Sequence, residues 1–158
     1  MKRIPKIYLE TTIFNYFLDT ERGDSHKATV ELFNAIRKGR FYAFTSQYVI
    51  NELKKASEPK RMKMIKLISE YNIAILEPCD ESAMLADKYI EAHIIPEKFK
   101  YDAFHVAITA TNELDIILSF NFKHINKLSV KELTAYINTR EGYFKQVRIC
   151  TPMEVIEE

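Results

Sequence analysis

Cysteine, glycine and proline are scarce in this sequence, and each shortage excludes a class of protein. The 158 residues include 2 cysteines, 3 glycines and 5 prolines. Cys79 and Cys150 allow one disulfide at most and do not form a metal-type CxxC pair, which is typical of a reduced cytoplasmic chain and not of a disulfide-stapled secreted one. So few glycines and prolines argue against a β-sandwich with many tight turns and favour long helices joined by short loops.

Charge of one sign is also lacking, as are long hydrophobic runs. Lysine and arginine number 23 against 22 aspartates and glutamates, so an anionic substrate must be held by a local group of residues and not by a polybasic coat. No stretch approaches the roughly 18 apolar residues of a membrane span, and the N-terminus lacks the apolar run of about 7–15 residues that a signal peptide needs. We expect an intracellular, cytoplasmic protein with no membrane partner.

Hydrophobic residues, by contrast, are plentiful. They make up 47% of the chain, which at this length is enough for a sizeable core and excludes global disorder. There is no repeat, linker or low-complexity tract. Residues 1–158 are therefore expected to form a single domain.

Short apolar runs alternate with segments of helical periodicity. The runs typical of β-strands lie at residues 6–9, 41–45, 73–76, 115–120 and 147–150. The helical segments follow Thr12 and Ser46, and lie at residues 25–37, 59 to about 71, 80–92, 101–111 and 130–137. The expected N-caps are Thr11 or Thr12, Ser25, Ser46 and either Asp80 or Ser82. This alternation predicts a three-layer α/β/α domain with a mostly parallel, short-stranded sheet.

Polar residues follow several of these runs. In chain order they are Glu10 with Thr11 and Thr12, Glu52, Asp102 and Asn121. In an open parallel sheet the ligand crevice lies beyond the carboxyl ends of the strands. We therefore expect three carboxylates and one amide to meet there.

Three carboxylates at close quarters repel one another and raise one another's pKa values. A divalent cation bound to the deprotonated groups relieves that repulsion, and oxygen ligands without cysteine or convergent histidine favour Mg²⁺ or Mn²⁺ over Zn²⁺. A cation held in this way supports hydrolysis of an RNA or DNA phosphodiester backbone.

Four segments carry a resemblance to a known family. They are YLETTIF at residues 8–14, TSQYVINEL at 45–53, YDAFHVAIT at 101–109 and ILSFNFKHI at 117–125. In this order the segments resemble the PIN-domain nucleases, specifically the VapC-like toxins of prokaryotic toxin–antitoxin pairs, over nearly the whole chain. The resemblance implies a Mg²⁺- or Mn²⁺-dependent endoribonuclease acting on RNA, a homodimer, and neutralisation by a cognate antitoxin.

The resemblance also implies a role for each candidate residue. The family's first acidic ligand falls on Glu10, its supporting hydroxyl on Thr12, its helix glutamate on Glu52, its third acid on Asp102 and its fourth polar ligand on Asn121. The family normally has aspartate at the position of Glu10, and the extra methylene moves the carboxylate by roughly 1 Å, which in an ordered site can cost about 10²-fold in rate. Aspartate is also frequent at position 121, and Asn121 removes one negative charge, so we expect one tightly bound metal ion and not two.

Ordinary structural roles are also open to these residues when each is taken singly. Glu52 can be a solvated helix residue paired with Lys54 or Lys55, and Asp102 can satisfy the free amides at a helix N-terminus. His105, one turn after Asp102, can orient that carboxylate.

The residues around the candidate site also have alternative roles. For both His105 and His124, a core histidine satisfied by a neighbour is the commoner case. The lysines and arginines at 54–66, and the lysines at 98, 100, 123 and 127, either form a basic rim for an RNA backbone or are solvated surface charge. The aromatic residues Phe14, Tyr16, Phe17 and Tyr101 are expected in the core or in dimer contacts, and not as base-stacking platforms.

Three functions remain open on the sequence. The first is a metal-dependent ribonuclease in which Glu10, Glu52, Asp102 and Asn121 form the site. The second is a catalytically degenerate PIN-like domain that binds RNA or protein. The third, a phosphoacceptor signalling domain of the receiver type, requires a lysine at the end of its last strand, where this sequence has Thr151 and Pro152.

Overall fold

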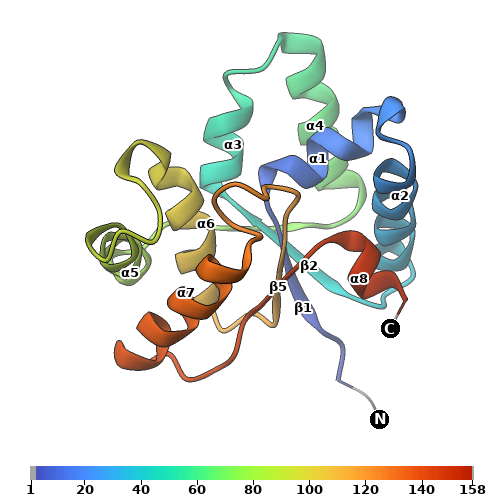
Figure 1. Cartoon of the computed structure of the whole chain (residues 1–158). Helices are drawn as coiled ribbons and strands as arrows, with labels where there is room; N and C mark the ends of the chain where they lie inside the picture. The colour runs from blue at the N-terminus through green and yellow to red at the C-terminus, as the bar shows by residue number, and fades with distance from the viewer. Residues whose placement is uncertain (1–2, 158) are drawn as a thin grey trace.

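The computed structural model describes residues 3–157 and contains one sheet of five parallel strands (Figure 1). The strands are β1 (Lys6–Leu9), β2 (Tyr42–Ser46), β3 (Ala74–Leu76), β4 (Ile116–Leu118) and β5 (Arg148–Cys150). Their order across the sheet is β3-β2-β1-β4-β5, and each neighbouring pair is parallel. The expected parallel, short-stranded sheet is therefore confirmed.

Helices cover both faces of the sheet. They are α1 (Thr11–Leu18), α2 (Asp24–Arg37), α3 (Gln47–Leu53), α4 (Glu58–Glu70), α5 (Asp80–Glu91), α6 (Lys100–Thr111), α7 (Leu128–Arg140) and α8 (Pro152–Ile156), with 3-10 turns η1 (Thr20–Arg22) and η2 (Glu97–Phe99). In Figure 1, α5, α6 and α7 lie on one side of the sheet and α2 and α8 on the other. Helix α5 packs on α6 and α7, and α2 packs on α1 and α8. This is the three-layer α/β/α arrangement that the sequence predicts.

The two central strands, β1 and β4, are almost completely buried. Ile7, Tyr8, Leu9, Ile117 and Leu118 have no exposed surface. A continuous apolar run is what a parallel strand covered on both faces requires, and burying each aliphatic side chain contributes roughly 1.5–3 kcal/mol. The core is thus organised around the strands that lead into the candidate site.

The register of β1 and β4 brings their carboxyl ends to the same level. Leu9 lies opposite Leu118, and the next residue, Glu10, donates its backbone N–H to the Leu118 carbonyl at 3.2 Å. The residues that follow the two strands, Glu10 and Ser119, are therefore neighbours although 109 positions separate them in sequence.

Strand β4 is shorter than the apolar run 115–120 that predicts it. Ser119 and Phe120 remain buried, but the Phe120 backbone N–H donates to the Thr12 hydroxyl at 2.8 Å instead of extending the strand. Hydrophobicity alone does not show where a buried chain leaves the sheet, because the turn depends on a side-chain acceptor from another segment.

Three of the expected helix N-caps are wrong. Helix α1 begins at Thr11 with Glu10 at its N-cap, so Thr11 and Thr12 are inside the helix. Helix α2 begins at Asp24 after Gly23, whose φ of 60° suits glycine, so Ser25 is inside the helix. Helix α5 is capped by Cys79, with Ser82 at the third helical position donating back to the Cys79 carbonyl at 2.9 Å. Ser82 therefore supports the cap but does not occupy it.

Ser46 occupies the N-cap of α3 as expected, but its side chain has another partner. It makes no side-chain hydrogen bond to the helix. Its hydroxyl instead lies 2.6 Å from the Tyr8 hydroxyl in the buried interior. The polar side chain at this helix end thus points into the domain, toward the candidate site.

Two negative findings apply to residues 3–157. None of the helices in that range is long and apolar enough to cross a membrane. Cys79, which is exposed, and Cys150, which is buried, are not joined by a disulfide.

Candidate functional site

The four candidate ligands come from four segments at the carboxyl end of the sheet. Glu10 is the N-cap of α1, Glu52 lies in the last turn of α3, and Asp102 lies in the first turn of α6. Asn121 follows β4. The Glu52 charge raises the pKa values of both Glu10 and Asp102, and the Asn121 side chain lowers the pKa of Asp102. The three carboxylates therefore influence one another's charge at this end of the sheet.

Glu10 is the most deeply buried of these carboxylates. Its side chain is only 3% exposed, and one oxygen, Oε1, accepts hydrogen bonds from the Thr12 and Ser119 hydroxyls, each at 2.6 Å. Burial raises the pKa of Glu10, and the nearby Glu52 adds to the increase, although His105 and the two hydroxyls oppose it. Both hydroxyls donate to Oε1, so neither of them donates to Oε2.

Glu52 is held in a similar way by a threonine and a histidine. Its Oε1 accepts a hydrogen bond from the Thr11 hydroxyl at 2.8 Å and lies 2.6 Å from His105 Nε2. Burial raises the pKa of Glu52, but the hydrogen bond and charge of His105 outweigh it and hold that pKa below its usual value. The alternative pairing with Lys54 or Lys55 is not the main contact, since Lys55 contributes only a weaker charge attraction.

His105 is fully buried and connects Glu52 to the interior of the domain. Because a carboxylate only accepts hydrogen bonds, His105 donates through Nε2–H to Glu52. Its Nδ1 lies 2.6 Å from the Tyr8 hydroxyl, which in turn lies 2.6 Å from the Ser46 hydroxyl. The chain Ser46–Tyr8–His105–Glu52 fixes the ring and, through it, the carboxylate.

The proposed orientation of Asp102 by His105 is therefore wrong, because the ring bonds to Glu52 and Tyr8. Asp102 interacts with the ring only through charge. Burial lowers the pKa of His105, but the Glu52 hydrogen bond and the charges of Glu52, Glu10 and Asp102 outweigh it, so the pKa is raised. His105 is thus a core histidine satisfied by neighbours that also belongs to the site.

Asp102 and Asn121 form the other side of the site. The Asn121 side chain lowers the pKa of Asp102, and its Oδ1 accepts the His124 backbone N–H at 3.1 Å. Burial raises the pKa of Asp102, with His105, His124 and Asn121 acting in the opposite direction. The His124 ring stacks on Phe99 at 3.9 Å between centroids, so it also has a packing role.

The expected mutual increase of carboxylate pKa values is right for two of the three groups. The pKa values of Glu10 and Asp102 are raised, with burial the larger cause and repulsion from Glu52 a smaller one. The pKa of Glu52 is lowered instead, because His105 stabilises the ionised form of Glu52. His105 thus supplies a counter-charge to the cluster from within the chain.

The candidate residues supply oxygen donors, the type that a hard divalent cation prefers. The candidate ligands are oxygen atoms, which Mg²⁺ and Mn²⁺ prefer. The hydrogen bonds to Glu10 and Glu52 fall on Oε1 in both residues, so the two Oε2 atoms take none of these four bonds. Within residues 3–157, no three histidine, cysteine, aspartate or glutamate side chains form a ready metal cage.

Three residues of the site were missed from the sequence. Ser119 donates to Glu10 and accepts the Asn121 backbone N–H at 2.9 Å, so it links two of the candidate ligands. Tyr8 and Ser46 support His105. Ser119 was identifiable, because it is a polar residue that interrupts the apolar stretch 116–120. A tyrosine inside a strand, by contrast, carries no sequence signal of a polar role.

Exposed lysines and packed aromatic rings surround the site. Lys55 lies 5.8 Å from the Tyr101 ring centroid, and Lys98 lies 5.2 Å from that of Phe99. The four aromatic residues expected in the core or in dimer contacts all have packing partners within the chain. Phe14 packs on Phe33, Tyr16 on Phe120, Phe17 on Phe33, and Tyr101 on Tyr48 and Phe104.

The chain matches no protein-family model, and no curated protein is significantly similar to it.

The Tyr8 hydroxyl is expected to stabilise the domain measurably. Tyr8→Phe leaves His105 Nδ1 and the Ser46 hydroxyl without this partner in a buried position, which costs about 1–3 kcal/mol. Urea unfolding of wild type and variant measures the difference. Tyr136→Phe, at a tyrosine that is 62% exposed, is the control and should change stability by less than about 0.5 kcal/mol. Equal unfolding midpoints for Tyr8→Phe and wild type would contradict the buried chain.

Proposed function

We propose that this chain is a Mg²⁺- or Mn²⁺-dependent endoribonuclease of the PIN-domain type. The observation that carries the proposal is the arrangement of Glu10 and Glu52. Hydroxyls and His105 hold one oxygen of each carboxylate, and the other oxygen takes none of those bonds. Carboxylates held in this way are preorganised for a cation, since their rotamers are fixed before it arrives.

Each residue has a distinct part in this proposal. Glu10, Glu52, Asp102 and Asn121 would hold the cation, which when bound lowers the pKa of water and neutralises charge that develops on the phosphate. Thr12 and Ser119 fix Glu10, and Thr11 and His105 fix Glu52. Exposed lysines around the site would attract the RNA backbone. These lysines are Lys55, Lys98, Lys100, Lys123 and Lys127.

The resemblance to VapC-like toxins supplies the biological setting of the proposal. In that setting the chain is the toxin of a prokaryotic type II toxin–antitoxin pair, acts in the cytoplasm, forms a homodimer and is neutralised by a cognate antitoxin.

A catalytically degenerate PIN-like domain that binds RNA or protein is the second candidate, and specific contacts favour it. Glu10 is one methylene longer than the family's aspartate, and the Asn121 side-chain oxygen already accepts a hydrogen bond from the His124 backbone N–H. His105 also provides Glu52 with a counter-charge from within the chain. The receiver-type alternative gains no support, because the residue after β5, Thr151, caps α8 together with Glu154.

Incubation with a mixed RNA pool, with Mn²⁺ or with EDTA, tests the proposal. We expect cleavage that requires the metal. The double variant Glu10→Asp/Asn121→Asp separates the two candidates, because it restores the family's usual residues. In an active nuclease its rate should differ from that of wild type by at most about 10²-fold. Cleavage that appears only in the double variant would establish the degenerate domain instead.

A further inference from the structure

The turn that follows β4 presents an aromatic ring beside the candidate ligands. Phe122 comes directly after Asn121 and is 55% exposed. The other exposed aromatic residues of the described chain lie in β2, in α7 and before β5, and are Tyr42, Tyr136 and Phe144. A single exposed apolar ring is ordinary on a protein surface, and what distinguishes Phe122 is the place where it is held.

Hydrogen bonds fix the backbone of this turn. The Asn121 carbonyl accepts the backbone N–H groups of Ile125 and Asn126 at 3.2 and 2.8 Å. The Asn121 side chain accepts the His124 backbone N–H at 3.1 Å, and the Asn126 side chain donates to the Ser119 carbonyl at 3.0 Å. Ile125 is completely buried, so it anchors the turn in the core. The exposed ring is therefore carried by a rigid backbone.

The Phe122 ring rests on a second ring that is itself fixed. Its centroid lies 6.5 Å from that of Phe120, with the ring planes at 71°, which is an edge-to-face arrangement. Phe120 is buried and stacks on Tyr16 of α1, with the centroids 4.0 Å apart. Phe122 thus has a buried support while more than half of its surface remains in solvent.

The charges beside Phe122 suit an anionic polymer. Lys123 follows it in sequence, and Lys127 is the N-cap of α7; both are exposed. Within residues 3–157, neither lysine forms an ion pair with a carboxylate. Proteins bind single-stranded nucleic acids with aromatic rings that stack on bases and with cations that contact the backbone. The turn supplies both kinds of group next to the candidate ligands.

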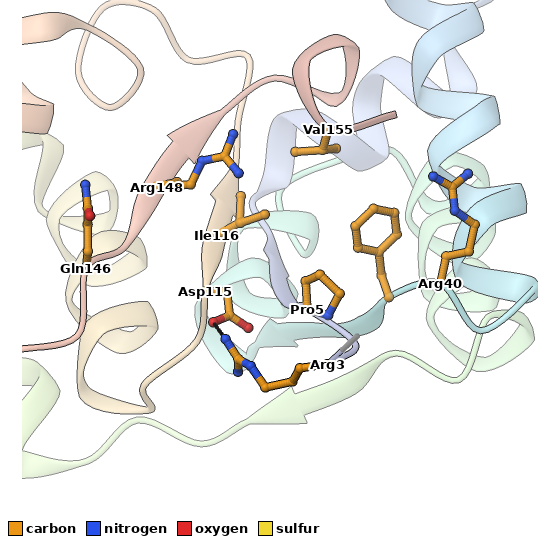
Figure 2. A pocket seen from close by; sticks show the side chains of 9 residues that line it. Arg3, Pro5, Arg40, Asp115, Ile116, Gln146, Arg148 and Val155 are labelled. Atoms are coloured by element: carbon orange, nitrogen blue, oxygen red, sulfur yellow. Dashed lines mark hydrogen bonds and ion pairs between the residues drawn. The ribbon is translucent and has the colours of Figure 1, made fainter. Parts of the chain in front are cut away.

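A cavity of about 410 Å³ at the other end of the sheet is too distant to bind the same base (Figure 2). Pro5 and Phe41 line it and directly precede β1 and β2, and Ile116, which also lines it, is the first residue of β4. Ser119 is three residues further along the chain, or about 10 Å at the rise of a parallel strand. The sheet therefore separates this cavity from the candidate ligands, and a base beside the reacting phosphate has to be bound at the carboxyl end.

We propose that Phe122 is a stacking platform for one base of a single-stranded RNA whose backbone lies at the candidate ligands. This inference rests on the RNA binding proposed above and adds a preference for single strands. In a duplex the bases stack on one another, so a base has to be unstacked before it can meet Phe122. A single strand offers the face of any base, so the preference does not depend on sequence.

Binding of a fluorescently labelled, unstructured ten-nucleotide RNA, followed by anisotropy, tests the proposal. The titrations contain Ca²⁺, which takes oxygen ligands as Mg²⁺ and Mn²⁺ do. Phe122→Ala should weaken binding at least about fivefold, the low end of the effect of removing one base stack. Phe122→Leu, which keeps an apolar side chain without a ring, should also weaken it. Phe122→Trp should bind at least as tightly as wild type, which shows that the loss is of stacking and not of folding.

Two controls separate stacking from other effects. Phe144→Ala makes the same change at a residue that is 80% exposed and follows the opposite end of α7, and it should bind as wild type does. A ten-base-pair RNA duplex should bind equally to wild type and Phe122→Ala, because its base faces are covered.

Equal affinity of wild type and Phe122→Ala for the single strand would overturn the proposal, as would the absence of saturable RNA binding by wild type. An equal loss of single-strand and duplex binding would assign the ring to a backbone contact instead. Unchanged RNA affinity together with a changed molecular mass in solution would assign it to a contact between two copies of the chain.

The result is distinguishable from a failure of the proposed nuclease. A chain that binds single strands through Phe122 but cleaves no RNA contradicts the nuclease and supports the stacking platform. A chain that cleaves RNA in the presence of Mn²⁺ and binds it equally well without the Phe122 ring does the reverse.

Discussion

Asp102→Asn and Glu52→Gln are each expected to lower metal-dependent RNA cleavage by more than about 100-fold while the domain remains folded. Each substitution removes one negative charge and keeps the shape of the side chain. Loss of a residue that merely supports a metal ligand costs about 10–100-fold, so loss of a ligand carboxylate should cost more. Initial rates on a labelled RNA in Mn²⁺ measure the effect.

Matched substitutions at surface positions control for nonspecific effects. Asp87→Asn and Glu91→Gln make the same chemical changes at exposed residues of α5 and should leave the rate unchanged. Near-wild-type cleavage by either Asp102→Asn or Glu52→Gln would contradict the site assignment. Loss of cleavage in the surface variants as well would point to a contaminating nuclease.

Glu10→Gln is expected to stabilise the metal-free protein and to remove its response to metal. Because burial raises the folded-state pKa of Glu10 above the unfolded value, the folded state loses stability as the pH rises through the two values, and the penalty remains at higher pH. Glutamine is neutral and keeps an acceptor for the Thr12 and Ser119 hydroxyls. The NH₂ group of the glutamine can take the place of Oε2, because the Thr12 and Ser119 hydroxyls both donate to Oε1.

Thermal unfolding at pH 8, with EDTA or with Mn²⁺, measures both halves of this prediction. In EDTA the variant should unfold at a higher temperature, and each 1 kcal/mol gained corresponds to roughly 2–4 °C in a domain of this size. Mn²⁺ should raise the midpoint of wild type, since it binds the folded state, and leave that of the variant unchanged. A variant less stable than wild type in EDTA would show that the Glu10 charge contributes to the fold.

The α/β fold was predictable because its cause lies in local patterns. Short apolar runs at 6–9 and 41–45 become β1 and β2 within one residue, since a parallel strand covered on both faces has to be apolar throughout. The ends of elements were less predictable. Gly23 and not Ser25 precedes α2, and the run at 115–120 yields only three strand residues, because caps and turns depend on partners elsewhere in the chain.

The membership of the site was predictable in part, for a geometric reason. Parallel strands end at one edge, so Glu10 and Asn121, which follow β1 and β4, had to lie near each other. The position of Asp102 in the first turn of its helix was also predictable.

The directions of the side chains were not predictable. His105 is one turn from Asp102 on the same helix, yet it bonds to Glu52 of α3 and to Tyr8 of β1. Which of two neighbouring carboxylates a buried ring meets depends on how the helices pack. The contact between His105 and Glu52 explains why the pKa of Glu52 is lowered while that of Asp102 is raised.

Isothermal titration of the metal-free protein with Mn²⁺, run in parallel on wild type and Asp102→Asn, tests the central claim most directly. The proposed site predicts saturable binding of one Mn²⁺ per chain by wild type, and binding that is lost in the variant. Incubating the same samples with mixed RNA should give metal-dependent cleavage by wild type alone. Absence of Mn²⁺ binding by the wild-type protein would contradict the metal site and favour the degenerate, partner-binding domain.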